Sequence, residues 1–260
     1  MLWQRRNMLL NLTLRELKSR YKNSVLGFLW SILTPLFMAG IYVFFLRLLA
    51  RGVPLESIII GVFAWQFTAQ AVHEGLVSIT SNANLVKKVF FPRLILPTAI
   101  TLGNLVNYLL SLIVQFILLA VLLAWRGEAM AWTALFVPLV VAYHALFLLS
   151  LAWLLSAANV YFRDAQHLVG VLLSAWFFAS PAMYDLSIVQ NVATKWPIVL
   201  DLYLLNPMAI IITAYRALIL PGATFPLTWA VAVGGAIPVF LLLISYFVFQ
   251  RAQRNFADLL

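Results

Sequence analysis

The sequence contains no cysteine, which excludes disulfide bonds, thiolate metal sites and a cysteine nucleophile. Charged residues are also scarce, at 10% of the chain against about 25% in a typical soluble domain. With 8 acidic residues and 3 histidines, scattered along the chain, the clusters that acid–base or metal catalysis needs are not evident. The phosphate-binding pattern G-x-x-x-x-G-K-[ST] is missing too, so this chain does not supply a P-loop ATPase.

What the sequence has in abundance is apolar residues. They form 64% of the chain, against about 45–50% in soluble domains, and the mean hydropathy is +0.99. A bilayer core is crossed by about 20 helical residues. Longer stretches without any charged residue occupy 94–125, 129–162 and 217–250. The sequence therefore predicts an integral membrane protein.

The expected fold is all-α, with six transmembrane helices in a domain of residues 26–260. The predicted spans are 26–49, 57–77, 94–125, 132–158, 168–184 and 227–249. Residues 185–225 are expected to form an external re-entrant helical hairpin, because Asn206 and Pro207 interrupt the apolar run there and Arg216 lies near its end.

Residues 1–25 are predicted to form a cytoplasmic amphipathic helix in the membrane interface. A stripe of apolar residues at +4, +3 and +4 spacing lies beside a basic stripe; it consists of Leu10, Leu14, Leu17 and Tyr21. The alternative is a solvated basic tail. A cleaved signal peptide is not expected, because this polar segment precedes an apolar run that is too long for one.

The net charge of +9 belongs mainly to one side of the predicted membrane domain. Twelve of the 17 Lys and Arg residues would lie on the side of the two termini and five on the other side. By the positive-inside rule, both termini are expected in the cytoplasm. The basic residues flank apolar spans, so we interpret them as topology signals and lipid-headgroup contacts rather than as a nucleic-acid surface.

Four segments, in the same order along the chain, resemble the membrane subunit of type-two ABC exporters for polysaccharides: the Wzm family of O-antigen export and its teichoic-acid and capsule relatives. The segments are LKSRYKNSVLGFLWSILTPL (17–36), NANLVKKVFFPRLILPTA (82–99), NVYFRDAQHLVGVLLSAWFFASPAMY (159–184) and LNPMAIIITAYRALIL (205–220). The resemblance implies a homodimer in the bacterial inner membrane with two copies of a separate P-loop ATPase subunit. It implies that the partner binds ATP and magnesium, that the substrate is a polyprenyl-diphosphate-linked glycan, and that this chain holds no cofactor or metal.

Two groups of residues, each containing basic side chains, are candidate sites in such an exporter. The first, expected to couple the membrane domain to the ATPase, comprises Leu85, Lys87, Lys88, Val89, Phe90, Phe91, Arg15 and Lys18. Its alternative interpretation is charge that only sets topology. The second, expected at the inner mouth to contact the lipid diphosphate, comprises Arg20, Lys22 and Arg163. For Arg163, an ion pair with Asp164 that joins two helix ends is an alternative.

Aromatic residues near the predicted external mouth are candidates for lining a glycan channel: Trp176, Phe177, Tyr184 and Tyr203. The alternative interpretation is that these residues belong to the interfacial aromatic belt or pack against lipid. His144 stands alone on an apolar stretch, which favours a packed or hydrogen-bonded histidine over a metal ligand.

Other functions stay open at this point. The same family includes permeases for teichoic acid, capsule or another small lipid or drug. A proton-coupled secondary transporter is favoured by His73 and Glu74 at membrane depth but disfavoured by the lack of an internal repeat. A membrane enzyme acting on polyprenyl phosphates would need more acids and histidines than the chain offers.

Overall fold

The computed structural model of the chain describes residues 6–21, 24, 26–49, 54–89, 91–162 and 164–260, and the regular structure within these residues is helical. The α-helices are α1 (Arg6–Tyr21), α2 (Trp30–Leu49), α3 (Leu55–Val77), α4 (Ala83–Lys88), α5 (Ile95–Ala124), α6 (Val137–Tyr161), α7 (Ala165–Phe178), α8 (Leu186–Ala193), α9 (Ile198–Leu204), α10 (Pro207–Ile219), α11 (Trp229–Ala252) and α12 (Phe256–Leu259). Short 3-10 turns are η2 (Gly27–Leu29), η3 (Thr80–Asn82), η4 (Trp132–Phe136) and η5 (Gln253–Asn255).

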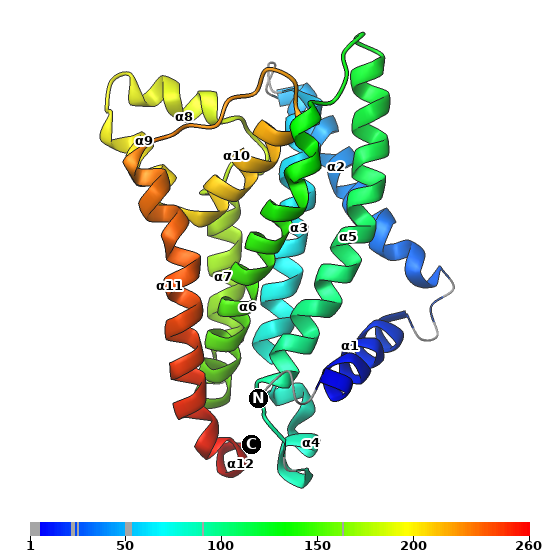
Figure 1. Cartoon of the computed structure of the whole chain (residues 1–260), viewed down its shortest axis with the longest axis vertical. Helices are drawn as coiled ribbons and strands as arrows, with labels where there is room; N and C mark the ends of the chain where they lie inside the picture. The colour runs from blue at the N-terminus through cyan, green and yellow to red at the C-terminus, as the bar shows by residue number, and fades with distance from the viewer. Residues whose placement is uncertain (1–5, 22–23, 25, 50–53, 90, 163) are drawn as a thin grey trace.

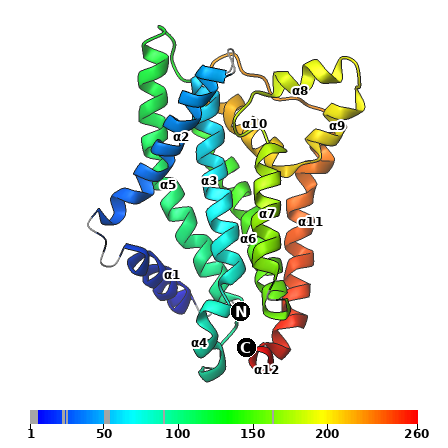
Figure 2. The ribbon, with the colours of Figure 1, turned by 180° about the vertical axis from the view of Figure 1, so that it is seen from behind.

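The long helices run side by side along the long axis of the molecule (Figures 1 and 2). Helices α8, α9 and α10 gather at one end of this bundle, which we call the α8 end. Helices α4 and α12 lie at the opposite end, which we call the α4 end. The bundle therefore separates the candidate coupling residues of α4 from the candidate channel aromatics near α8.

Four helical segments are long and apolar enough to cross a membrane: Leu55–Val77, Ile95–Ala124, Trp132–Tyr161 and Trp229–Asn255. They match four of the predicted spans to within a few residues. α9 and α10 pass the same test as a pair, but they meet at an angle of 89°. The described helices thus provide four spans, or five if the bent pair is one.

Helix α7 differs most from the span predicted at 168–184. It has 14 residues and ends at Phe178. At 1.5 Å per residue it is about 21 Å long, shorter than the hydrocarbon core of about 30 Å. Six spans with an external hairpin remain a prediction.

Helix α5 has its polar residues inside and its apolar residues outside. Asn104, Asn107 and Gln115 lie at helical spacing and are buried in the bundle. Ile113 and Ile117 on the other face are 57% and 59% exposed. In water, a helix would bury its apolar residues and expose its polar ones. In lipid, polar side chains are favoured inside the protein, where they can form hydrogen bonds. The distribution indicates that lipid surrounds this helix.

The centre of the bundle is α3, which is buried along most of its length and packs against α5, α6 and α7. A histidine lies in this core: His144 is fully buried, and its Nε2 is 2.8 Å from Thr68 Oγ1. Its ring also meets the edge of Phe67. His144 is therefore the packed, hydrogen-bonded histidine that the sequence favoured.

Candidate functional site

The two segments predicted to couple the chain to an ATPase meet at the α4 end. Helix α1 packs along α5 and buries Leu12 and Thr13 there. From its outer face, Arg15 Nη2 donates a 2.8 Å hydrogen bond to Asn82 Oδ1, in the turn η3 that leads into α4. Leu10 and Leu14, from the predicted membrane-facing stripe, are exposed. The N-terminal helix is thus bonded to the turn before α4, while Leu10 and Leu14 of its stripe are exposed and Leu17 is half-buried.

The residues around α4 divide into an inner and an outer set. Val86 and Phe91 are 3% and 7% exposed and anchor the segment in a second core at the α4 end. Lys87, Lys88 and Val89 are exposed. The exposed set forms a basic and apolar surface of the kind expected to meet a partner.

One predicted member of that surface requires correction. Phe91 is buried in the core of this chain, because the segment after α4 turns back into the bundle, so it cannot be part of the exposed surface. Leu85 is half-buried against the same core, and Lys18 is exposed on α1. Phe90 lies outside the described residues.

The C-terminal segment packs beside α4. The Arg93 guanidinium donates a hydrogen bond to the Gln253 carbonyl and lies 5.9 Å from the centre of the Phe256 ring. Phe256 is fully buried and meets Phe249 edge to face, with 5.5 Å between the ring centroids. Helix α12 also contacts α4 directly. The exposed lysines of α4 therefore belong to a segment that is packed against the C-terminal helix.

The residues proposed to contact a lipid diphosphate are largely beyond what the structure describes. Lys22 and Arg163 lie outside the described residues. Arg20 falls in the last turn of α1, and its side chain is not described. Their meeting in one site remains a prediction.

The four candidate channel aromatics form two separate pairs toward the α8 end. Trp176 meets Trp65 edge to face at 5.8 Å between centroids, and Phe177 lies 5.4 Å from the same indole. The hydroxyls of Tyr184 and Tyr203 are 2.9 Å apart and hydrogen-bonded. All four candidates are half-buried. The structure pairs Trp176 and Phe177 with one cluster and Tyr184 and Tyr203 with another, and glycan lining by them remains a prediction.

Asn206 connects Trp176 to the bent helix pair, a role that the sequence analysis did not assign. Its Oδ1 accepts hydrogen bonds from the Met208 amide at 3.0 Å and from Trp176 Nε1 at 2.9 Å. Its Nδ2 donates to the Ala179 carbonyl at 3.0 Å and to Ser180 Oγ at 3.1 Å. Asparagine followed by proline is a typical helix start, so the capping role was readable from the sequence.

Arg216 is the second unassigned residue at the α8 end. Its side chain is buried, and it donates to the carbonyls of Ser57 at 2.8 Å, Tyr184 at 2.9 Å and Pro181 at 2.6 Å. A planar guanidinium with five N–H groups can satisfy several carbonyls at once. Arg216 therefore joins α10 to α3 and to the turn after α7, although the sequence suggested only an external topology charge.

Histidine, aspartate and glutamate are the side chains of this chain that could bind a metal or relay a proton. In the part of the chain that the structure describes, no three His, Asp or Glu side chains gather as a metal site would require. Glu74 accepts hydrogen bonds from Asn104 Nδ2 at 2.8 Å and Gln70 Nε2 at 3.2 Å, while His73 is exposed. Carboxamides do not titrate, so these two partners do not extend a proton relay from Glu74.

A bundle of long apolar helices with polar residues turned inward defines a multi-pass membrane protein. Residues 8–220 match the model of the family described as ABC-2 type transporter, and the chain belongs to that family. It is similar to the O-antigen export system permease protein RfbA of Myxococcus xanthus, with 36% identity across 99% of this chain and 96% of that protein. Two proteins of the same name from Klebsiella pneumoniae are 27% and 28% identical, each across 98% of this chain and 95% of the relative.

Proposed function

We propose that this chain is the permease subunit of an ATP-driven exporter that moves a polyprenyl-diphosphate-linked polysaccharide of the O-antigen type across the inner membrane. The observation that carries the proposal is the near full-length similarity to three O-antigen export permeases, the first of them 36% identical. The family match over residues 8–220 supports the same class of transporter.

The motor of such an exporter is a separate subunit. The sequence has no P-loop pattern, so ATP and magnesium are bound by a P-loop ATPase partner and this chain performs no bond chemistry. We propose two permease copies and two ATPase copies. The surface for each ATPase consists of the exposed part of α4, residues 87–89, and the neighbouring α1 with Arg15 and Lys18.

The packing at the α4 end supports a transmission route. Val86 and Phe91 share a core with Leu12 of α1, Trp153 of α6 and Phe249 of α11. Close-packed interiors resist deformation, so a push on α4 displaces the ends of these helices together. Alternate opening of a pathway between two permease copies would follow from that movement.

The proposed orientation places the α4 end in the cytoplasm with both termini. Lys87, Lys88, Arg251 and Arg254 all belong to this end, which agrees with the positive-inside rule. In this arrangement there are six spans, and α8, α9 and α10 form the external hairpin.

The first experiment is co-purification of the tagged chain from its native membrane. A P-loop ATPase in equal amounts, with ATPase activity in the complex, is the expected result. If the chain purifies alone under mild conditions, no ATPase subunit is associated with it. The exporter proposal would then be wrong, and the secondary-transporter interpretation would replace it. Deletion of the gene is expected to leave the lipid-linked polymer inside the cell, and the chemistry of that polymer distinguishes O-antigen from teichoic acid, capsule or a small lipid.

Charge reversal tests the coupling surface. The double substitution Lys87→Glu and Lys88→Glu is expected to reduce export and recovery of the ATPase at least tenfold, because the altered surface would be acidic and would repel a partner surface that is complementary to the native basic one. Asn191→Glu with Lys195→Glu, exposed at the α8 end, is the control and should leave ATPase recovery unchanged. Normal ATPase recovery and export in the Lys87 and Lys88 variant, with topology preserved, would remove α4 from the interface.

A further inference from the structure

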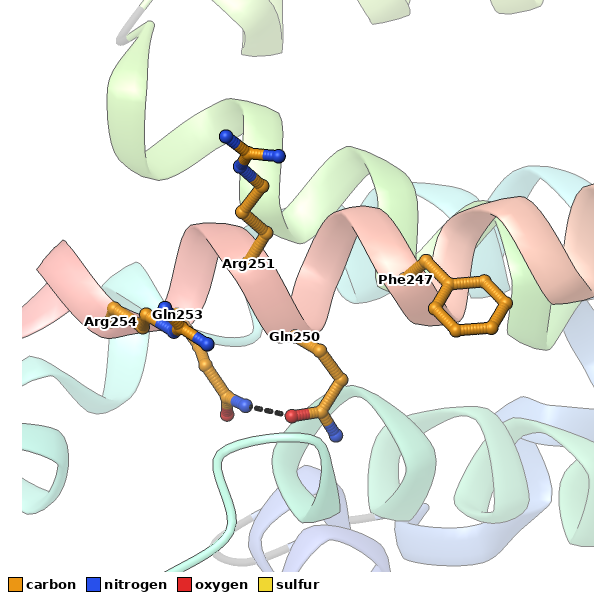
Figure 3. Close-up of a pocket in the computed structure, with 5 residues that line it drawn as sticks. All are labelled: Phe247, Gln250, Arg251, Gln253 and Arg254. Carbon is orange, nitrogen blue, oxygen red and sulfur yellow. Dashed lines mark hydrogen bonds between the residues drawn. The ribbon is translucent and has the colours of Figure 1, made fainter.

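The last turns of α11 and the turn η5 surround a pocket of about 420 Å³ (Figure 3). The residues that line it are Phe247, Gln250, Arg251, Gln253 and Arg254. Two guanidinium groups, two carboxamides and an aromatic ring thus face a space in which none of the lining residues is acidic. A pocket of this composition suits an anion rather than a cation.

The two guanidinium groups are available to a ligand. Arg251 and Arg254 are both exposed, and within the described residues neither forms an ion pair with a carboxylate. The carboxamides of Gln250 and Gln253 are hydrogen-bonded to each other on the side of the helix away from Arg251 (Figure 3), so in the described part of the chain they leave both guanidinium groups free of a side-chain partner. Arginine forks match phosphate oxygens in geometry and charge, so phosphate is the anion that this arrangement fits.

The pocket continues into an apolar stripe on the same helix face. Residues 247, 250, 251 and 254 follow the spacing i, i+3, i+4 and i+7, which places them on one side of α11. Going back along that side, Leu243 and Phe240 are 54% and 63% exposed. The surface therefore has a basic head and an apolar tail, in the order that an amphiphile with a phosphate headgroup requires.

Among the four apolar spans that the structure describes, the one formed by α11 is the least buried. In its most apolar stretch 17% of the residues are buried, against 78% in α3. Its basic end falls where a span leaves the hydrocarbon, at the depth of lipid phosphates. A ligand on this face would come directly from the surrounding bilayer.

We propose that this pocket binds the headgroup phosphate of an anionic phospholipid, with an acyl chain lying along Phe247, Leu243 and Phe240. A net negative headgroup is favoured over a zwitterionic one because the pocket carries two positive charges and no lining acid to receive an ammonium group. None of the residues that line the pocket is among those proposed to contact the exported lipid diphosphate, and the proposal does not depend on the export function.

Native mass spectrometry of the purified full chain in detergent tests the proposal. Phosphatidylglycerol, titrated against phosphatidylcholine of the same acyl chains, is expected to bind more tightly. A basic residue near an anionic lipid surface contributes about fivefold, so Arg251→Gln with Arg254→Gln should weaken phosphatidylglycerol binding roughly 25-fold. Arg251→Lys with Arg254→Lys keeps the positive charge without the planar guanidinium fork. Its affinity for phosphatidylglycerol should lie between those of the wild type and of the glutamine variant.

The control removes the same charge elsewhere at the α4 end. Lys87→Gln with Lys88→Gln should change phosphatidylglycerol binding by less than about threefold, because these lysines do not line the pocket. Phe247→Ala with Leu243→Ala tests the apolar half and should lower the affinity for phosphatidylglycerol without altering charge. Elution volume and helical circular dichroism establish that each variant is folded.

Three results would overturn the assignment. Equal phosphatidylglycerol binding in wild type and the arginine-to-glutamine variant would show that the pocket is not the site. Displacement of the lipid by millimolar inorganic phosphate would indicate a small-anion site with no role for the apolar stripe. If an equimolar polyprenyl diphosphate displaced phosphatidylglycerol, and did not bind the arginine-to-glutamine variant, the pocket would be assigned to the exported lipid instead.

Discussion

At the scale of single residues, Arg216 and Asn206 hold the α8 end together through polar contacts, which are buried or part-buried for Arg216 and part-buried or exposed for Asn206. Arg216 reaches the carbonyls of Ser57, Pro181 and Tyr184, and Asn206 reaches the end of α7. A buried polar group is costly when it loses its partners, and several groups depend on each of these side chains. The bent pair α9 and α10 is therefore held by a small number of side chains.

Replacement of Arg216 is expected to be strongly destabilising. Arg216→Leu leaves the Ser57, Pro181 and Tyr184 carbonyls without this donor, and a loss of about 3 kcal/mol is expected from the size of hydrogen bonds to charged groups. Thermal unfolding in detergent, followed by tryptophan fluorescence, measures the effect. Lys195→Leu, an exposed basic residue at the same end, is the control and should change the midpoint little. Equal midpoints for the two variants would contradict a structural role for Arg216.

At the scale of elements, close helix contacts depend on glycines that leave room for backbone. A Cβ atom on Gly61 would lie 2.2 Å from the Ala182 carbonyl oxygen, and one on Gly234 would lie 2.5 Å from the Leu204 carbonyl oxygen. The first contact seats α3 against the turn after α7, and the second seats α11 against the bend between α9 and α10. Small residues at such crossings are a general means of helix association in lipid.

A single methyl group at Gly61 is enough to test this contact. Gly61→Ala forces the backbone around Ala182 to move, and overpacking of this kind is expected to cost about 2 kcal/mol. Gly170→Ala in α7 is the matched control, because a Cβ there meets nothing within 4 Å and alanine favours helix. A lower unfolding midpoint for the first variant and an unchanged or higher one for the second is the expected pair of results. Unchanged stability in Gly61→Ala would mean that the two segments are not in contact.

Elements were more predictable from the sequence than the contacts between them. The helices at 55–77, 95–124, 132–161 and 229–252 coincide with apolar runs, because residues that avoid water also favour helix in lipid. The bend at Asn206 was visible as an Asn-Pro pair. Arg216 and Ser57 are 159 residues apart, however, and no local pattern brings them together. The burial of Phe91 was missed for the same reason, because exposure depends on which way a short segment turns.

At the scale of the whole molecule, the structure has two chemically different ends. The α4 end presents basic side chains such as Lys87, Lys88 and Arg254, while the α8 end holds aromatic rings and a buried guanidinium. This asymmetry supports one orientation in the membrane. An even number of spans would place α1, α4 and α12 on one side and α8 on the other.

The absence of native cysteine allows this orientation to be tested with single introduced thiols and no background. Asn84→Cys in α4 and Asp258→Cys in α12 should react with a membrane-impermeant maleimide only after the cells are opened, because both positions are exposed at the α4 end and neither belongs to the proposed ATPase surface. Asn191→Cys in α8 should react in intact spheroplasts, since it is exposed at the opposite end. The unmodified chain is the control for labelling without a thiol. Labelling of position 258 but not of position 84 in intact spheroplasts would require an odd number of spans after α4. The bent pair α9 and α10 would then be a full crossing, and the external hairpin would be ruled out.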